Sequence, residues 1–102
     1  MSVDVIVLYR PPADPAAFDR HYRTVHVPLV LAMPHLVSFE ITDGPVDTQG
    51  GDEVHFVARL RFRSQADLDA SLASPEGAAA VGDLANFAQA GAILVTTPMV
   101  AP

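Results

Sequence analysis

The amino-acid sequence predicts an α+β fold with the element order β-α-β-β-α-β. Three observations carry this prediction: short segments rich in β-branched residues, longer segments with apolar residues at helical spacing, and proline or glycine at the boundaries between them. Half of the 102 residues are hydrophobic and only 18% are charged, which is typical of a packed domain rather than a disordered chain. We therefore expect a single domain over residues 1–102.

The first strand is predicted over Val3–Tyr9, where both faces carry apolar side chains. This pattern is typical of a central strand that is covered on both sides. A helix should follow, because Asp14 can cap free amide groups and Pro15 suits the first helical position. The apolar stripe that should face the sheet consists of Phe18, Tyr22, Val25, Leu29 and Met33.

Pro28 interrupts this helical pattern. It lacks a backbone donor and its ring crowds the carbonyl of Thr24, so we expect a kink or break between His26 and Pro28. His26 lies at the edge of the apolar stripe, one turn beyond Tyr22. Pro34 should end the helix.

The second and third strands are predicted over residues 35–42 and 54–62. The first of these alternates apolar and polar side chains, as a half-buried strand does. Between them lies a run of turn-forming and acidic residues, which predicts an exposed loop.

Two helices and a final strand complete the chain. The helices should begin at Ser64 and at Ser74, each of which can cap a helix, and the second should end near Ala90. The inward face of this second helix should carry Val81, Leu84 and Ala88. The last strand is predicted over residues 92–97, closed by Pro98.

This order matches the ferredoxin-like arrangement, in which a four-stranded antiparallel sheet carries its helices on one face. The strands, however, have apolar side chains on both faces. The simplest resolution is a homodimer in which two sheets face each other and enclose a cavity.

Composition excludes several classes of partner and compartment. The net charge of −6, with six arginines and no lysine, argues against a nucleic-acid surface. No segment approaches the roughly 18 apolar residues of a membrane span. The N-terminal segment lacks a basic start and a long apolar run, so we expect no signal peptide and a cytoplasmic protein. The absence of cysteine removes disulfides, thiolate nucleophiles and cysteine metal sites.

Several short motifs together resemble the EthD family, which is named for ethyl tert-butyl ether degradation. They are LYR at 8–10, FDRHY at 18–22, HVPL at 26–29, SPEG at 74–77, GDLANFA at 82–88 and AG at 90–91. The resemblance covers nearly the whole chain and rests on the order and spacing of the motifs. One departure is His35, because the family more often has glycine after the proline.

The resemblance implies a dimeric α+β barrel, formed by small cytoplasmic homodimers that are often described as oxidoreductases or reductases. Related barrels include cofactor-independent monooxygenases, polyketide cyclases and lactone isomerases. The resemblance therefore implies a small, mostly apolar substrate inside the barrel, such as an aromatic, polyketide-like or ether-derived molecule.

His26 and Tyr22 are the predicted catalytic residues. Histidine can transfer protons near neutral pH, and Tyr22 lies four residues before it, close enough to orient the imidazole. The alternative is a structural role, in which the His26 ring binds the free carbonyl near the kink.

Four further residues are candidates for substrate binding. Tyr9 ends the first strand, where its hydroxyl can reach a substrate oxygen or water. His55, Arg59 and Arg61 should share one face of the third strand, and an arginine there could hold a carboxylate or an enolate oxygen. The alternative is that these arginines pair with acids such as Glu40.

The remaining polar residues are assigned structural roles. Asp19 and Arg23 have the spacing of an exposed helix pair, and His21, Asp83 and Asn86 are expected at the surface or in caps. On a regular helix His21 and His26 point about 140° apart, so they cannot share a metal ion. No glycine-rich phosphate loop or dinucleotide motif is present, and we expect no cofactor.

Two classes of function remain open from the sequence. The protein could be a cofactor-independent enzyme in which His26 and Tyr22 move a proton and Tyr9 or an arginine holds the developing oxyanion. For an oxygenase of this kind, the enolate of the substrate would have to activate dioxygen. Alternatively, it could bind or carry a hydrophobic metabolite, or accompany an oxygenase, without turnover.

Overall fold

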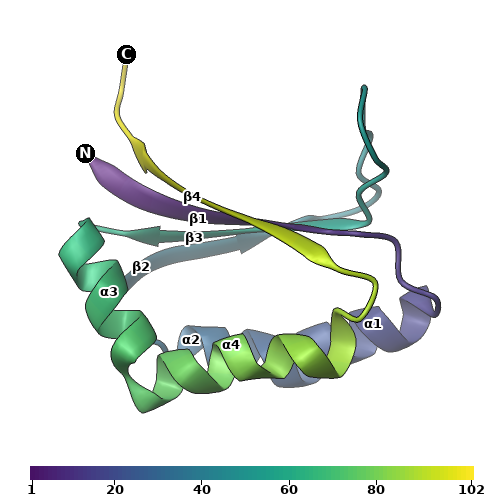
Figure 1. Ribbon diagram of the computed structural model, residues 1–102, viewed down its shortest axis with the longest axis horizontal. Helices are drawn as coiled ribbons and strands as arrows, with labels where there is room; N and C mark the ends of the chain where they lie inside the picture. Colours follow the sequence, from purple (N-terminus) through teal and green to yellow (C-terminus); the bar gives the residue numbers. More distant parts are fainter.

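The computed structural model describes all 102 residues and has a four-stranded sheet with helices on one face (Figure 1). The strands are β1 (Ser2–Tyr9), β2 (Leu36–Ile41), β3 (Phe56–Phe62) and β4 (Ala92–Met99), in the order β2-β3-β1-β4. Every pairing is antiparallel, and β1 is central, between β3 and β4. The predicted ferredoxin-like α+β fold is confirmed.

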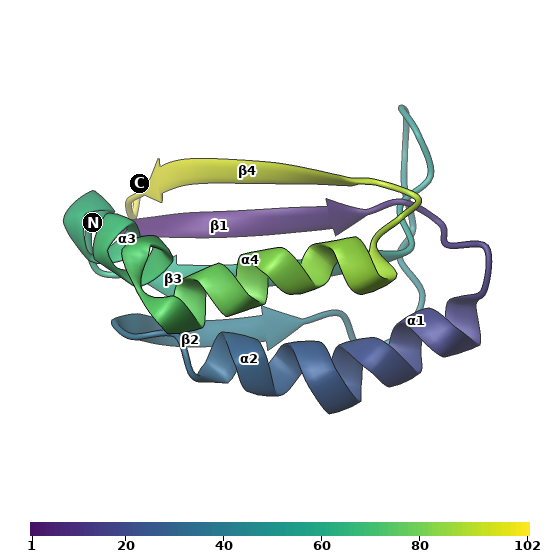
Figure 2. The same ribbon diagram turned by 60° about the horizontal axis from the view of Figure 1, so that its bottom comes forward.

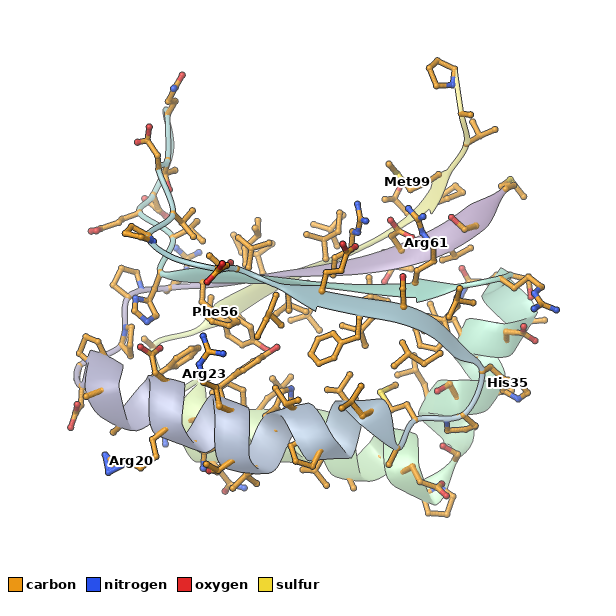
Figure 3. The ribbon with its side chains drawn as sticks, turned by 180° about the vertical axis from the view of Figure 1, so that it is seen from behind. Arg20, Arg23, His35, Phe56, Arg61 and Met99 are labelled. Carbon is orange, nitrogen blue, oxygen red and sulfur yellow. The ribbon has the colours of Figure 1, made fainter.

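The helical layer lies beneath the sheet. It consists of α1 (Pro15–His21), the π-helical turn η1 (Tyr22–His26), α2 (Val27–Leu31), α3 (Gln65–Ala73) and α4 (Pro75–Phe87). The continuous rod formed by α1, η1 and α2 lies beside α4 (Figure 2). The hydrophobic core fills the space between this layer and the sheet, where Figure 3 shows Phe56. No helix is both long and apolar enough to span a bilayer.

The first helical rod begins and bends for reasons that are visible in the sequence. The Asp14 carboxylate accepts a hydrogen bond from the Ala17 N–H at 3.1 Å, which caps α1 as predicted. The predicted irregularity before Pro28 is present as the wide turn η1, in which the Val27 N–H donates to the Tyr22 carbonyl. Because Pro28 has no N–H, the backbone leaves the α-helical pattern here and takes one extra residue into the turn.

This extra residue changes which side chains face the sheet. The predicted stripe is correct for Phe18, Tyr22 and Met33, which are buried. It is wrong for Val25, which is 40% exposed, whereas His26 is only 4% exposed. The wide turn therefore moves the inward position from residue 25 to residue 26.

The prediction for the inward face of α4 is wrong at Val81, which is 51% exposed. The buried residues of α4 are Gly77, Ala80, Asp83 and Phe87. Gly77 allows the start of α4 to approach α3 closely: a Cβ atom there would lie 2.0 Å from the Ser71 carbonyl oxygen. The buried face of α4 is therefore the one that carries Gly77, and not the one that carries Val81.

The sheet face opposite the helices is uncovered in the monomer. The alternation of β1 and its register with β4 place Ile6, Leu8, Ile93 and Val95 together on this face. Ile93 and Val95 are 44% and 39% exposed. Figure 3 shows Arg61 and Met99 on this same side of the sheet. As predicted, helices cover only one of two apolar faces.

Three strand ends differ from the prediction. β4 continues through Pro98, which lies opposite Val3 on an edge strand, where a missing N–H can be tolerated. β3 begins at Phe56 rather than Val54, so His55 precedes the strand. His35 lies in the turn before β2 with φ at +66°, a conformation that favours glycine.

Gly77→Ala should destabilise the fold by about 1–3 kcal/mol, because the added methyl group must push apart the α3–α4 corner. Gly82→Ala is the matched control, since a Cβ at Gly82 meets no atom within 4 Å. The control should be stabilising by about 0.5–1 kcal/mol, because alanine favours a helix more than glycine does. Urea unfolding of both variants measures these changes, and equal effects would refute the steric account.

Candidate functional site

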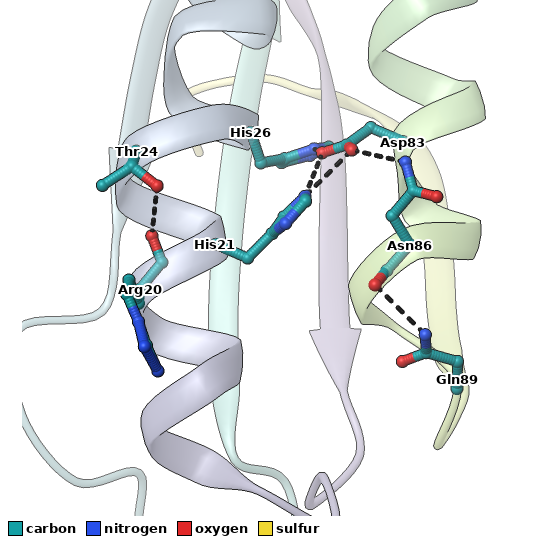
Figure 4. A network of polar contacts seen from close by, with 7 residues as sticks. All are labelled: Arg20, His21, Thr24, His26, Asp83, Asn86 and Gln89. Atoms are coloured by element: carbon teal, nitrogen blue, oxygen red, sulfur yellow. Dashed lines mark hydrogen bonds and ion pairs between the residues drawn. The ribbon is translucent and has the colours of Figure 1, made fainter.

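A buried cluster formed by one carboxylate and two imidazoles joins the two halves of the helical layer (Figure 4). The Oδ2 atom of Asp83 lies 2.9 Å from Nδ1 of His26, and its Oδ1 atom lies 2.9 Å from Nε2 of His21. The Asn86 side-chain amide donates to Oδ1 at 3.0 Å. The Asp83 side chain is only 4% exposed. Asp83 therefore connects α4 to both ends of the π-helical turn.

The wide turn η1 is what brings the two histidines to one carboxylate. On a regular α-helix, residues five apart point about 140° away from each other. In a π-helical turn, hydrogen bonds span five residues, so His21 and His26 come to lie on the same side. The expectation that they point apart is therefore wrong. They share an anion, however, and no group of three or more potential ligands is arranged to hold a metal ion.

The hydrogen bonds determine the charge state of the cluster. Burial alone would raise the pKa of Asp83, but hydrogen bonds from Asn86, His21 and His26 outweigh it and lower that pKa below its usual value. Burial also lowers the pKa of His26, and this effect is larger than the opposing effect of Asp83. At neutral pH the site thus contains an ionised Asp83 and a neutral His26. Because an ionised carboxylate only accepts hydrogen bonds, Nδ1 of His26 is the donor.

His26 also lines an apolar cavity between the sheet and the helices. The cavity has a volume of about 70 Å³, and 15 of its 16 lining residues are hydrophobic, His26 being the exception. At its outer end lie Leu72, Val81 and Leu94, which are 44%, 51% and 52% exposed. Cavities that enclose a drug-sized ligand are commonly about 300–1,000 Å³, so this one holds only a small group.

The predicted residues Tyr22 and Tyr9 line the same cavity. The Tyr22 ring lies 5.1 Å from the His26 ring and 5.7 Å from the Tyr9 ring. The Tyr22 hydroxyl is buried and makes no hydrogen bond of ordinary geometry, although the neighbouring Tyr9 phenol is close enough to contribute to its raised pKa. Asp83, rather than the Tyr22 hydroxyl, therefore orients His26. Burial raises the pKa values of both phenols, so both stay protonated at neutral pH.

The predicted arginines lie on the opposite face of the sheet and are paired with acids. Arg61 donates from Nε and from its terminal nitrogen to the two oxygens of Asp4, at 2.9 and 3.1 Å. Arg59 donates to Glu40. The hydrogen bond from Arg61 lowers the pKa of Asp4, whose side chain is fully buried. These contacts support the structural alternative for both arginines and place them far from His26 in the fold.

His55 does not share a face with these arginines. Its Nε2 atom lies 3.3 Å from Oδ1 of Asp19, and its ring contacts that of Phe18 edge-on at 5.1 Å. His55 therefore turns toward α1, because it precedes β3 and escapes the alternation of the strand. Asp19 was expected to pair with Arg23 but contacts His55 instead.

The sequence interpretation missed Asp83 and His21 as members of the site. Both were expected at the surface or in caps, whereas Asp83 is 5% exposed and binds both histidines. One signal was available, because the segment GDLANFA carries a single acid in a helix of small residues. Its inward orientation, however, puts it on the face of α4 that carries Gly77 and Ala80, whereas the hydrophobic pattern favoured the face of Val81.

The lowered pKa of His26 should make the folded protein less stable in mild acid. Below about pH 6.5 the unfolded chain binds a proton at this residue that the folded chain does not, so the free energy of unfolding should fall as pH falls. His26→Gln should weaken this dependence between pH 7.5 and 5.5, whereas His35→Gln, at an exposed residue, should not. Urea unfolding at several pH values tests this, and equal slopes for all three proteins would contradict it.

Comparison with known proteins agrees with this fold. The EthD domain family matches residues 10–91. An uncharacterized 11.0 kDa protein of the thcB-thcC intergenic region of Rhodococcus erythropolis is 42% identical over 95 residues, which cover 91% of this chain and 90% of that protein.

Solved structures show the same similarity. An ethyl tert-butyl ether degradation (EthD) family protein from Bacillus halodurans C-125 is 27% identical, with a TM-score of 0.88, over 98% of this chain and all of that one. A dimeric ferredoxin-like protein of unknown function from Thermobifida fusca YX is 17% identical, with a TM-score of 0.72, over 97% of this chain and 92% of that one. Since the family match spans most of the chain and the relative from Rhodococcus erythropolis is 42% identical, the chain belongs to the EthD family.

Proposed function

We propose that this protein binds a small, mostly apolar molecule that carries an oxygen atom, and that His26 transfers a proton to or from it. The observation that carries this proposal is the meeting of His26 and Tyr22 on the wall of an apolar cavity, where the buried Tyr22 hydroxyl makes no hydrogen bond of ordinary geometry and has only the Tyr9 phenol as a polar neighbour. An unpaired buried hydroxyl lowers the stability of the folded protein by about 1–3 kcal/mol. A ligand oxygen atom that accepts its hydrogen bond would remove this cost.

The hydrogen bonds of His26 suit it to act as a base. Its Nδ1 atom donates to Asp83, which leaves Nε2 as the nitrogen that can take a proton. Burial keeps the ring neutral at pH 7 by lowering its pKa. The Tyr22 hydroxyl, kept protonated by its raised pKa, can donate a hydrogen bond to the oxygen on which negative charge develops. Such a proton transfer requires no redox cofactor.

The size of the cavity limits how the substrate would lie. A volume of about 70 Å³ accommodates only the reacting end of the molecule. The remainder would lie along the exposed apolar side chains of Leu72, Val81 and Leu94 at the outer end. A carrier that encloses a whole hydrophobic metabolite would need a larger cavity, and this difference favours the enzyme over the carrier.

Cyclohexanone provides a probe of both binding and proton transfer, because its α-protons exchange with deuterium through an enolate. In D₂O the wild-type protein should bind the ketone and accelerate exchange, and His26→Gln should reduce the acceleration by about 10²–10⁴-fold. Tyr22→Phe should weaken binding of the ketone about fivefold without weakening binding of cyclohexane, because it removes a single hydrogen bond. NMR follows both exchange and binding.

The outcomes separate the two functional classes. Binding without accelerated exchange in the wild-type protein would overturn the proposed catalysis and leave a binding protein. Acceleration that persists in His26→Gln would remove His26 from the mechanism. Arg59→Gln is the control, because its side chain lies on the other face of the sheet and should leave exchange unchanged.

We also propose that the protein forms a homodimer through its uncovered sheet face. Ile6, Leu8, Ile93 and Val95 form an apolar area there, beside the ion pair of Asp4 with Arg61. The fold relative from Thermobifida fusca is described as dimeric, which supports this proposal. Stable interfaces bury about 800 Å² on each partner.

Val95→Arg should convert this dimer to a monomer, because it places an unpaired charge in the interface. Val95 is already 39% exposed in the single chain, so the substitution should not unfold it. Sedimentation velocity at micromolar concentration should show a dimer for the wild-type protein and a monomer for the variant. Wild-type protein that sediments as a monomer would refute the proposal.

A further inference from the structure

The two histidines that share Asp83 face different environments. His26 is buried, with 6% of its side chain exposed, and lines the apolar cavity. The side chain of His21 is 27% exposed and lines a separate groove of about 580 Å³ between the start of α1 and the end of α4. The Nε2 atom of His21 faces Asp83, and its Nδ1 atom has no partner in the protein (Figure 4). Asp83 is thus the link between a cavity and a solvent-accessible groove.

We propose that His21 exchanges protons with solvent on behalf of His26, so that the two rings share a single extra proton around Asp83. This inference rests on the proposed function, because it assigns a route for the proton that His26 takes in the cavity. It makes His21 a positioning and charge-balancing residue, since it acts through Asp83 and does not touch the substrate.

The charge balance of the buried cluster is the physical reason. One carboxylate can neutralise one imidazolium, whereas a second positive ring only about a carboxylate's width away would be repelled in a site with little water. Proximity of His21 indeed contributes to lowering the pKa of His26. Protonation of His26 is therefore most favourable when His21 releases a proton to solvent.

The proposed step conserves every proton. The proposed step starts with the extra proton on His21, which donates from Nε2 to Asp83, while His26 is neutral and donates from Nδ1. The substrate C–H or O–H bond breaks, its electron pair stays on the substrate, and an N–H bond forms at Nε2 of His26. The N–H bond at Nδ1 of His21 then breaks and its proton passes to water in the groove. No atom is oxidised or reduced, and the charge on the three side chains is unchanged.

Few other charged groups face these rings. The elements around His26 present Asp83 from α4, His21 from α1, and the neutral phenols of Tyr22 and Tyr9. Around His21, the groove adds only Asp14, while Asn86 bonds to Asp83 and Phe87 stacks on the ring at 5.2 Å. Asp83 is therefore the dominant charge for both histidines.

The alternative is that His21 only holds Asp83 in place. The two roles predict opposite changes when His21 is replaced by glutamine, whose amide can donate to Asp83 but cannot carry a proton. If His21 balances charge, its removal relieves repulsion and the pH midpoint of His26 should rise. If His21 only holds the carboxylate, weaker placement of Asp83 should let the midpoint fall.

The test is an NMR titration of the His26 ring in the ligand-free protein. In His21→Gln the midpoint should rise by about one pH unit relative to the wild type. In Asp83→Asn, which removes the shared anion, it should fall, and His35→Gln should leave it unchanged. A midpoint that stays constant or falls in His21→Gln would overturn the proposal.

A second measurement needs no variant. In the wild-type protein the His26 signal should show two inflections, because coupled groups do not titrate independently. A single inflection would also overturn the proposal. Both measurements use ligand-free protein, so their failure is distinguishable from a failure of the proposed binding and proton transfer.

Discussion

The buried carboxylate of Asp83 is the interaction on which the arrangement of the helical layer depends. It accepts hydrogen bonds from both ends of the π-helical turn and from its own helix, and thereby fixes α4 against the first helical rod. An ionised carboxylate with this little exposure is stable only because each partner donates to it. Removing Asp83 would leave a buried imidazole without its partner and a helix pair without its polar link.

The π-helical turn makes His21 and His26 point to the same side, and the turn itself arises from Pro28. Pro28 cannot donate to the carbonyl of Thr24, and the chain responds with one extra residue in the preceding turn. The Thr24 hydroxyl donates to the Arg20 carbonyl at 2.7 Å, a side-chain bond of the kind that often accompanies bent helices (Figure 4). Pro28, which was expected only to kink or break the helix, thus determines which residues meet Asp83. Wide turns of this kind are frequent at functional sites, in agreement with the proposed role of His26.

Regular patterns in the sequence predicted the fold well, but they could not predict irregular backbone geometry. The strands, the Asp14 and Ser74 caps and the uncovered sheet face all follow from periodicity and capping chemistry. Positions that depend on one extra residue or on close approach could not be found in this way. Val25 was assigned to the core in place of His26, and Val81 in place of Asp83, because a constant helical step was assumed and hydrophobicity was used to choose the inner face.

The site was predicted in part for the same reason. His26, Tyr22 and Tyr9 do meet at one cavity. Tyr9 follows the alternation of β1 and Tyr22 follows the predicted helical stripe, whereas the wide turn brings His26 inward. Arg59 and Arg61 belong to the other face of the sheet, where they pair with Glu40 and Asp4. The charges on that face are paired, whereas the Tyr22 hydroxyl in the cavity is left without a hydrogen bond of ordinary geometry, and this difference separates a structural network from a site that has room for a ligand.

The central claim is that neutral His26 presents a free Nε2 atom because its Nδ1 atom donates to an ionised Asp83. The tautomer of His26 tests this claim most directly, and ¹⁵N–¹H correlation NMR of the imidazole at pH 7.5 measures it. The account predicts a proton on Nδ1 and none on Nε2. A proton on Nε2 and none on Nδ1 would contradict it, because His26 would then be an acceptor toward a protonated Asp83 and could not act as a base in the cavity.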